Sequence, residues 1–251
     1  MSRIDIDFNV ALKGVGRCKM KNSEFIAKSA SEYYFKSYVG VMNKGLAGWV
    51  NRKFHKDLEN HKFVKEIKSP IVLELGASQD LHRNFVKDDF QSYFVTDLDE
   101  KLLNIGAQSS PFDSRVMYQV VDATATPYAD NQFDRVIATC LIAHMRYPED
   151  VLQEWRRLVK NTGVLSFYVA AEPSLLLRVA RLFTHKISAR KLGVVNYDLL
   201  QYGGHHSHFP AIKTFINWTF KNDVIDTRRF PAKWLPWNLS FYTVYHIKVK
   251  K

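Results

Sequence analysis

The sequence predicts an α/β fold in which helices flank a mostly parallel sheet. From Ser69 onward, short apolar runs rich in β-branched residues alternate with amphipathic stretches, as in the strand–helix units that build parallel sheets through right-handed crossovers. The run 71–75 is closed by Gly76 and followed by a polar turn, as expected at the carboxyl end of a buried parallel strand. A chain of 251 residues can bury the core of one large domain of this kind.

Composition excludes several classes of protein. A hydrophobic content of 46% is typical of a globular chain and too high for a disordered one. Cys18 and Cys140 are far apart and form no CxxC pattern, so neither a disulfide framework nor a metal site is expected. The N-terminus carries acids where a signal peptide needs an apolar core, and no run of about 18 apolar residues occurs. We therefore expect a cytoplasmic protein.

Residues 1–68 are expected to form a helical N-terminal lid. Apolar residues recur three and four positions apart in 23–35 and again in 46–59, which is the spacing of amphipathic helices. Three glycines between residues 40 and 48 argue against one continuous helix there. The alternative is a segment that only packs against the core and contacts no ligand.

Residues 69–172 are expected to form the core, with ligands at the carboxyl ends of its strands. Five strands are expected, at 71–75, 93–96, 117–121, 135–139 and 164–170. The clearest helix begins at Pro148, with Glu149 and Asp150 complementing the helix dipole in its first turn, and ends before Gly163.

Residues 173–222 interrupt this alternation and are expected to form a cap over the carboxyl ends of the strands. No acid lies between Glu172 and Asp198, and basic residues interleave with apolar ones over 175–191, a pattern typical of helices at membrane surfaces. A helix is expected at 211–221.

Residues 223–251 are expected to close the sheet with an antiparallel hairpin. The two apolar stretches of this tail, 224–230 and 239–249, flank a loop rich in Pro and Trp. Such a hairpin would complete the sheet at one edge.

Gly76 and Asp97 are spaced as in a nucleotide-binding βαβ unit. Asp97 lies 21 residues after Gly76, at the end of the second expected strand, where a carboxylate can accept hydrogen bonds from ribose hydroxyls. A dinucleotide turn needs further glycines so that its backbone can approach a pyrophosphate. NAD and FAD are therefore disfavoured. The alternative is a strand that ends in glycine and binds no nucleotide.

Another acid, Asp122, ends the third expected strand, and Phe133-Asp134 leads into the fourth. With the Gly76 and Asp97 segments in order before it, the stretch 120–137 resembles the class I S-adenosylmethionine (SAM)-dependent methyltransferases. The resemblance is to the small-molecule branch related to the quinone-biosynthesis enzymes and covers about residues 70–172. It implies a Rossmann-like fold with a seven-stranded, mostly parallel sheet that ends in an antiparallel hairpin.

The resemblance also implies SAM as cofactor and S-adenosylhomocysteine as product. The family's GxGxG pattern is here Gly76, Ser78 and Asp80, and these positions would border the methionine part of SAM. Asp97 would hold the ribose, and Asp122 would lie at the adenine. The implied cofactor-binding residues are Glu74, Gly76, Ala77, Ser78, Asp80, Asp97, Leu98, Asp122, Ala123 and Thr139. The alternative role for Asp80 is to cap the following helix.

Histidines are the candidate catalytic bases, because a base within about 3 Å assists methyl transfer to a hydroxyl. His144 follows the fourth strand, and His205, His206 and His208 cluster on the expected cap. The alternatives are a hydrogen bond to a loop carbonyl for His144 and a surface loop for the other three.

The expected function is methylation of a small-molecule or glycan hydroxyl. The ending 236–246 is similar to that of relatives found among enzymes that decorate cell-surface polysaccharides, so a sugar is the first hypothesis. The alternatives are a quinone or natural-product O- or C-methyltransferase, an RNA methyltransferase, and a non-catalytic SAM-binding protein. A net charge of +11 favours anionic partners, but no RNA-binding module is evident. We therefore expect contact with the inner face of the membrane rather than with nucleic acid.

Overall fold

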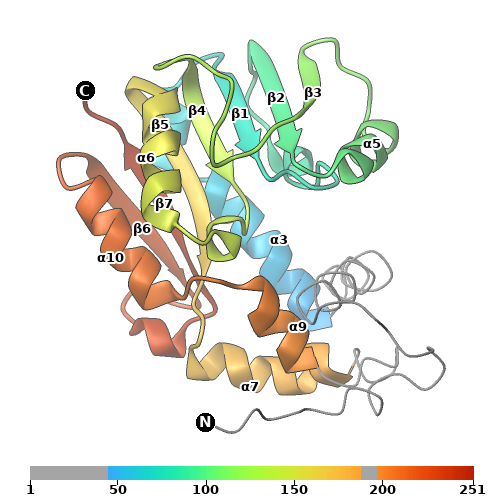
Figure 1. The fold of residues 1–251 in the computed structure, drawn as a ribbon, viewed down its shortest axis with the longest axis vertical. Helices are drawn as coiled ribbons and strands as arrows, with labels where there is room; N and C mark the ends of the chain where they lie inside the picture. Colours follow the sequence, from blue (N-terminus) through green and yellow to red (C-terminus); the bar gives the residue numbers. More distant parts are fainter. Residues whose placement is uncertain (1–44, 188–196) are drawn as a thin grey trace, which may run out of the picture. The chain divides into compact units, whose positions relative to one another are not determined.

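The computed structural model describes residues 45–187 and 197–251. It divides into two compact units, one formed by Met1–Asn51 and Arg178–His206 and the other by Arg52–Leu177 and Ser207–Lys251. The second unit holds the sheet (Figure 1). Most of the expected lid, residues 1–44, and part of the expected cap, residues 188–196, lie outside the described residues.

Seven strands form one sheet in the order β3-β2-β1-β4-β5-β7-β6. Their bounds are Ile71–Leu75 (β1), Ser92–Asp97 (β2), Val116–Val120 (β3), Phe133–Ala138 (β4), Val159–Ala170 (β5), Val224–Phe230 (β6) and Tyr242–Lys248 (β7). The pairs among β1 to β5 are parallel, whereas β7 is antiparallel to both β5 and β6. This confirms the predicted fold class and its closing hairpin. The strand order reverses between β1 and β4, the position at which such sheets bind ligands.

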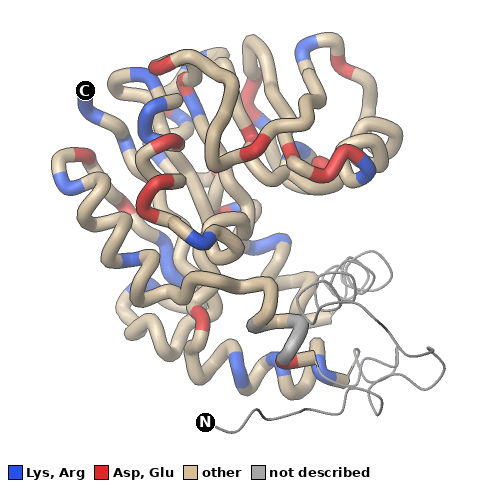
Figure 2. Tube along the Cα trace, viewed as in Figure 1, with Lys and Arg blue, Asp and Glu red and all other residues tan. Residues whose placement is uncertain are grey.

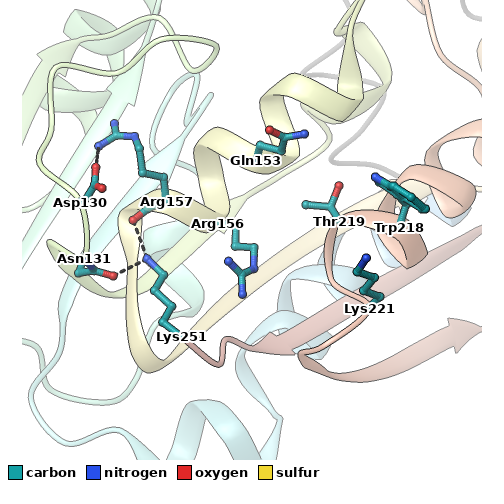
Figure 3. Close-up of a pocket in the computed structure, with 9 residues that line it drawn as sticks. All are labelled: Asp130, Asn131, Gln153, Arg156, Arg157, Trp218, Thr219, Lys221 and Lys251. Carbon is teal, nitrogen blue, oxygen red and sulfur yellow. Dashed lines mark hydrogen bonds and ion pairs between the residues drawn. The ribbon is translucent and has the colours of Figure 1, made fainter.

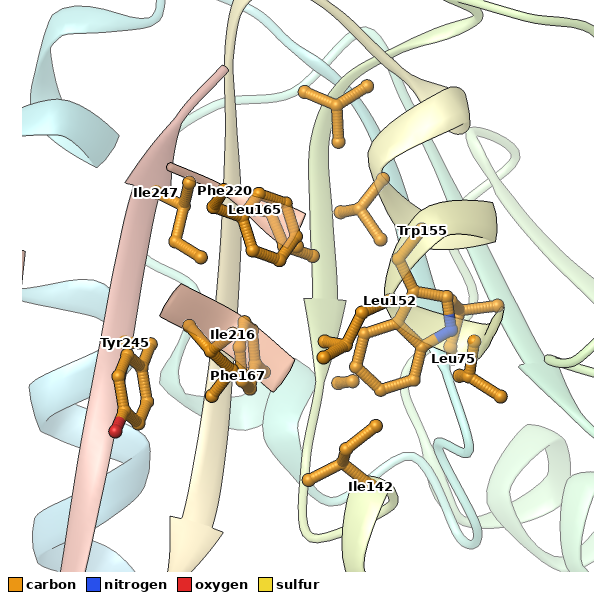
Figure 4. Packing of buried hydrophobic residues seen from close by; sticks show 14 of the residues in the cluster. Leu75, Ile142, Leu152, Trp155, Leu165, Phe167, Ile216, Phe220, Tyr245 and Ile247 are labelled. Carbon is orange, nitrogen blue, oxygen red and sulfur yellow. The ribbon is translucent and has the colours of Figure 1, made fainter. Parts of the chain in front are cut away.

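Two helices, α6 (Pro148–Leu158) and α10 (Phe209–Thr219), pack on one face of the sheet. The apolar stripe of α6 places Leu152 and Trp155 against the strands, and α10 contributes Ile216 and Phe220 to the same core (Figure 4). Each of these four side chains is fully buried. The core therefore sits between this helical layer and β1, β4, β5 and β7.

The other face is covered by α5 (Glu100–Ser109) and by the C-terminal part of α3 (Gly45–Glu59). The layer between α3 and the strands is polar. The Tyr242 hydroxyl donates to Asp57 Oδ2 over 2.9 Å, and His246 Nε2 lies 3.1 Å from the Asp57 carbonyl oxygen. Buried polar groups need such partners, so this part of α3 is joined to the sheet by specific hydrogen bonds. The short helix α4 (Lys62–Glu66) follows it.

The observed elements differ from the expected ones at several points. The helix expected directly after β1 is replaced by the short 3₁₀ helix η3 (His82–Phe85), which ends in extended backbone at Val86. Strand β5 begins at Val159, where Val159 pairs with Phe133. Helix α10 begins at Phe209, before the expected 211.

The remaining described elements lie in the expected cap and in the loops. Helices α7 (Leu175–Phe183) and α9 (Tyr197–Gly204) belong to the cap segment. The 3₁₀ helix η4 (Ile142–His144) follows β4, and η5 (Trp237–Leu239) precedes β7. Within the described ranges, no helix combines the length and apolar character needed to span a bilayer.

Candidate active site

The turn after β1 keeps the backbone conformation of a glycine-rich turn. Its φ angles are +65° at Gly76, +54° at Ser78 and +57° at Asp80, values that residues with a side chain rarely adopt. The Ala77 N–H donates to the Thr96 carbonyl over 2.9 Å. Every second residue of the turn is therefore left-handed, although only Gly76 is a glycine.

Asp97 is joined directly to this turn. Its Oδ2 accepts a hydrogen bond of 2.8 Å from the Ser78 N–H, and its Oδ1 accepts one of 2.9 Å from the Asp99 N–H. Each carboxylate oxygen has two acceptor directions, so both oxygens can accept a further hydrogen bond. The two amides thus orient a half-buried carboxylate beside the left-handed turn.

Asp122 lies at the same edge of the sheet, because the Val121 N–H donates to the Asp97 carbonyl over 3.0 Å. Its Oδ1 accepts 2.8 Å and 2.7 Å hydrogen bonds from the Thr124 amide and hydroxyl. Next to it, the buried Ala123 accepts a 3.1 Å hydrogen bond from the Trp155 indole N–H. Leu98 adds an exposed apolar side chain. Acids recur along the segment that joins β2 to α5 (Figure 2).

Glu74 is fully buried one residue before the end of β1. Its Oε2 accepts a 2.6 Å hydrogen bond from the Tyr93 hydroxyl, while Oε1 has no partner among the described residues. Burial raises the pKa of this carboxyl to about 7. Glu74 therefore holds an unsatisfied acceptor two residues before Gly76, the first residue of the turn.

Asp80 ties the turn to two other elements. Its Oδ2 accepts hydrogen bonds of 2.7 Å from Arg83 Nε, 2.9 Å from the Ser110 hydroxyl and 2.6 Å from the Tyr118 hydroxyl. The helix-capping role is wrong, since the residue before η3 is Leu81 and this end has no side-chain cap. Only the buried Oδ1, which has no partner among the described residues, remains for a cofactor contact.

The end of β4 closes the other side of the turn. A Cβ atom added to Gly76 would lie 2.9 Å from the Leu141 side chain, so glycine permits this close approach as well as the left-handed φ. Thr139 follows β4 and is half-buried, and Cys140 after it has a φ of +56°. The predicted cofactor-binding positions thus gather at the carboxyl ends of β1, β2, β3 and β4.

Two of the four candidate histidines lie on segments that are hydrogen-bonded to each other. His144 ends η4 and His208 precedes α10; both are exposed. Their segments are joined because the Ser207 N–H donates to the Ala143 carbonyl over 3.1 Å and the Ser207 hydroxyl donates to the Met145 carbonyl over 3.1 Å.

His205 and His206 belong to the other compact unit. There the ring nitrogens of His205 lie 3.1 Å and 3.3 Å from the side-chain nitrogen of Gln201. The choice of catalytic base among the four histidines stays a prediction.

Sequence reasoning missed the buried charges behind the turn. Arg135 in β4 pairs with Glu59 of α3 over 2.6 Å, and His82 lies 2.8 Å from the same carboxylate. One signal was available, because an arginine inside an apolar central strand requires a buried partner. The sequence did not indicate which of the chain's acids that partner would be.

A hollow of about 540 Å³ lies near the C-terminus (Figure 3). Its cationic side chains are engaged by the protein itself. Arg157 pairs with Asp130 over 2.7 Å, Arg156 with Asp223 over 2.8 Å, and Lys251 Nζ donates to the Arg157 carbonyl over 2.9 Å. None of the predicted site residues lines it, so this hollow is separate from the candidate active site.

Comparison with known proteins locates the match in the same part of the chain. Residues 73–167 match the family model of the methyltransferase domain. The ubiquinone/menaquinone biosynthesis C-methyltransferase UbiE of Bordetella avium (strain 197N) is 31% identical over 109 residues, which cover 41% of this chain and 43% of that protein. The aligned region thus spans less than half of that relative.

Solved structures share the fold at low sequence identity. The N-methyltransferase NodS from Bradyrhizobium japonicum WM9, in complex with S-adenosyl-L-homocysteine, has a TM-score of 0.62 at 10% identity and covers 90% of this chain and 99% of that one. The CurJ carbon methyltransferase has a TM-score of 0.54 at 13% identity, with 93% and 72% covered.

The matched domain lies on the strands whose ends carry the left-handed turn and Asp97. The predicted family and its cofactor, SAM, are confirmed. Residues 73–167 thus carry a methyltransferase domain of this family.

Proposed function

We propose that this chain transfers the methyl group of SAM to a hydroxyl of a small-molecule or glycan acceptor. The observation that carries the proposal is the 2.8 Å hydrogen bond from the Ser78 N–H to Asp97 Oδ2, which joins the glycine-like turn to the acid expected at the ribose. This pairing survives although two of the three glycines of the family pattern are replaced.

The residues at this edge suit SAM better than a dinucleotide. Asp97 and Asp122 offer acceptors, and the connection between β2 and α5 supplies further acids. Carboxylates favour a ligand that carries a cationic sulfonium and an ammonium, whereas they would repel a pyrophosphate. Within the described part of the chain, Glu74 Oε1 has no partner, and it can accept a hydrogen bond from a ligand. Leu141 approaches Gly76 closely, so the part of the ligand at the turn would have to be compact.

In the proposed reaction the protein positions the reactants and moves one proton. Bound SAM supplies an activated methyl group. Asp97 would accept hydrogen bonds from the ribose hydroxyls, and Leu98 and Ala123 would offer apolar surface to the adenine. A ring nitrogen of one of the four candidate histidines, His144, His205, His206 or His208, would take the proton of the acceptor hydroxyl. Positioning and exclusion of water supply the rest of the rate.

The acceptor would be read by residues 173–222. The segment begins at the carboxyl edge of the sheet, and Phe209 within it returns to the same edge. Glu172 follows β5, and its carbonyl accepts a 2.9 Å hydrogen bond from the Phe209 N–H, while the Ser174 hydroxyl donates to the Ser240 carbonyl over 2.7 Å. The division into a lid (1–68), SAM-binding core (69–172), substrate cap (173–222) and hairpin (223–251) therefore stands as our proposal.

A sugar of a cell-surface polysaccharide, carried on a lipid, is the acceptor we propose first, because the cap combines cations with aromatic side chains. A quinone-like acceptor is the second candidate, and the similarity to a ubiquinone/menaquinone C-methyltransferase favours it. We place the protein in the cytoplasm, in contact with the inner face of the membrane through 175–191.

Incubation with SAM labelled on its methyl group tests the reaction and separates the two acceptors. We expect label in lipid-linked glycans from a membrane extract, and Asp97→Ala should reduce it by about 10- to 100-fold, the effect of losing hydrogen bonds to a charged group. Label that enters only a demethylated quinone would favour the second candidate. Label in cellular RNA alone would contradict both.

A further inference from the structure

Glu59, the last residue of α3, lies outside the region that matches the family but is bonded to the segment that follows the SAM turn. Its Oε1 accepts a 2.6 Å hydrogen bond from Arg135 Nη2 and lies 2.8 Å from His82 Nε2, and its Oε2 accepts a 2.9 Å hydrogen bond from Arg135 Nη1. One carboxylate therefore connects α3, β4 and η3.

The three charged or titratable groups of this connection are each more than nine-tenths buried. Burial alone would raise the pKa of Glu59, but the Arg135 charge and the hydrogen bond from His82 hold it well below its ordinary value. The carboxylate is therefore ionised. A buried ion that loses one partner is strongly destabilised, so the geometry of the three groups is tightly fixed.

His82 transmits this fixed geometry to the turn. It lies two residues after Asp80, at the start of η3. Its Nδ1 is 2.8 Å from His55 Nδ1, and the His55 ring stacks on Phe85 at 4.7 Å between centroids. Residues 82–85 are thus held from α3 at both ends of η3. The left-handed residues of the turn are conformationally unfavourable. The segment that follows them is held in place by α3.

We propose that Glu59 is a positioning residue for the SAM-binding turn. It holds His82, and through His82 the segment 76–82, so that the Ser78 amide meets Asp97 before any cofactor binds. This inference rests on the proposed function, in which this turn binds SAM. It assigns a role in cofactor affinity to a helix that precedes the matched domain.

Glu59→Gln tests the proposal because it removes the charge and keeps the shape. We expect the dissociation constant for SAM to rise about tenfold, while kcat at saturating SAM stays near that of the wild type. In the ligand-free protein, amide hydrogen exchange at residues 76–85 should become faster. If Glu59 acts through His82, adding Glu59→Gln to His82→Asn should weaken SAM binding no further.

Asp57→Asn is the matched control. Asp57 lies on the same helix and is equally buried, but its carboxylate contacts Tyr242 over 2.9 Å and Arg228 over 3.6 Å, at the hairpin end of the sheet. It should lower thermal stability and leave both SAM affinity and exchange at 76–85 unchanged. Equal effects of the two variants on SAM affinity would overturn the proposal, as would unchanged affinity and exchange in Glu59→Gln.

A wild-type protein that binds no SAM would refute the proposed function instead. The exchange measurement on the ligand-free protein would still decide whether Glu59 holds the turn.

Discussion

Ser78 and Asp80 adopt a left-handed backbone in which a residue with a Cβ atom loses about 1–2 kcal/mol. The structure compensates for this cost in different ways at the two positions. The Ser78 amide is used by Asp97, and the Asp80 carboxylate is used by three donors. The left-handed conformation of residues 78 and 80 is therefore stabilised by these hydrogen bonds, not by a preference of serine or aspartate for it.

Ser78→Gly should stabilise the protein, because it relieves the left-handed strain and keeps the backbone N–H that donates to Asp97. The gain is partly offset by the larger entropy of glycine in the unfolded chain, about 0.5–1 kcal/mol. We expect a rise in Tm of a few degrees with SAM affinity retained, measured by thermal unfolding with and without SAM.

Ser109→Gly is the control for this substitution. It places the same change in helix α5, where glycine should lower Tm. A lower Tm in both variants would show that residue 78 is not strained.

Among the described helices, α7 exposes several large apolar side chains. Its side chains Leu175, Val179, Leu182 and Phe183 are 57%, 42%, 50% and 72% exposed, and their spacing places them on one side of the helix. Arg178 and Arg181 lie on the same helix, which carries no acidic residue. This combination favours an anionic lipid surface.

Charge reversal tests this proposed contact. Arg178→Glu with Arg181→Glu should weaken binding to vesicles that contain anionic lipid by at least about 2 kcal/mol, or roughly thirtyfold, since each basic residue near the surface contributes about 1 kcal/mol. Sedimentation with vesicles measures the change.

Lys213→Glu, on the exposed side of α10, is the control and should have a smaller effect. If the wild-type protein fails to sediment with anionic vesicles, the membrane proposal is wrong.

The sequence predicted well those elements that are marked by residues within the element itself. Strand β1 was predicted with its observed bounds, and α6 from its proline, acids and apolar stripe. The short 3₁₀ helix after β1 could not be foreseen, because it is held by contacts with a distant element, such as the one between His82 and Glu59 of α3. The boundary of β5 also depends on a partner, since Val159 pairs with Phe133.

At the scale of the whole molecule, the alternation of strands and helices predicted the sheet and its closing hairpin, while the long-range polar contacts were not predictable. The acids at the strand ends were found because their spacing is set by the topology. The link between Glu59, Arg135 and His82 was missed because it joins residues up to 76 positions apart, and no local pattern encodes such a pairing. The turn and the acids could therefore be predicted from the sequence, whereas the buried ion pair and hydrogen bonds that hold the turn could not.

We expect SAM to bind at the edge formed by the turn and Asp97. Isothermal titration of the wild-type protein with SAM, S-adenosylhomocysteine and NAD tests it most directly. We predict binding of the first two ligands and weaker or undetectable binding of NAD. Asp97→Ala should weaken SAM binding by about 1.5–3 kcal/mol, while Asp113→Ala, an acid that precedes β3 and pairs with Arg115, should leave it unchanged. Tighter binding of NAD than of either SAM species, or full SAM affinity in Asp97→Ala, would contradict the account.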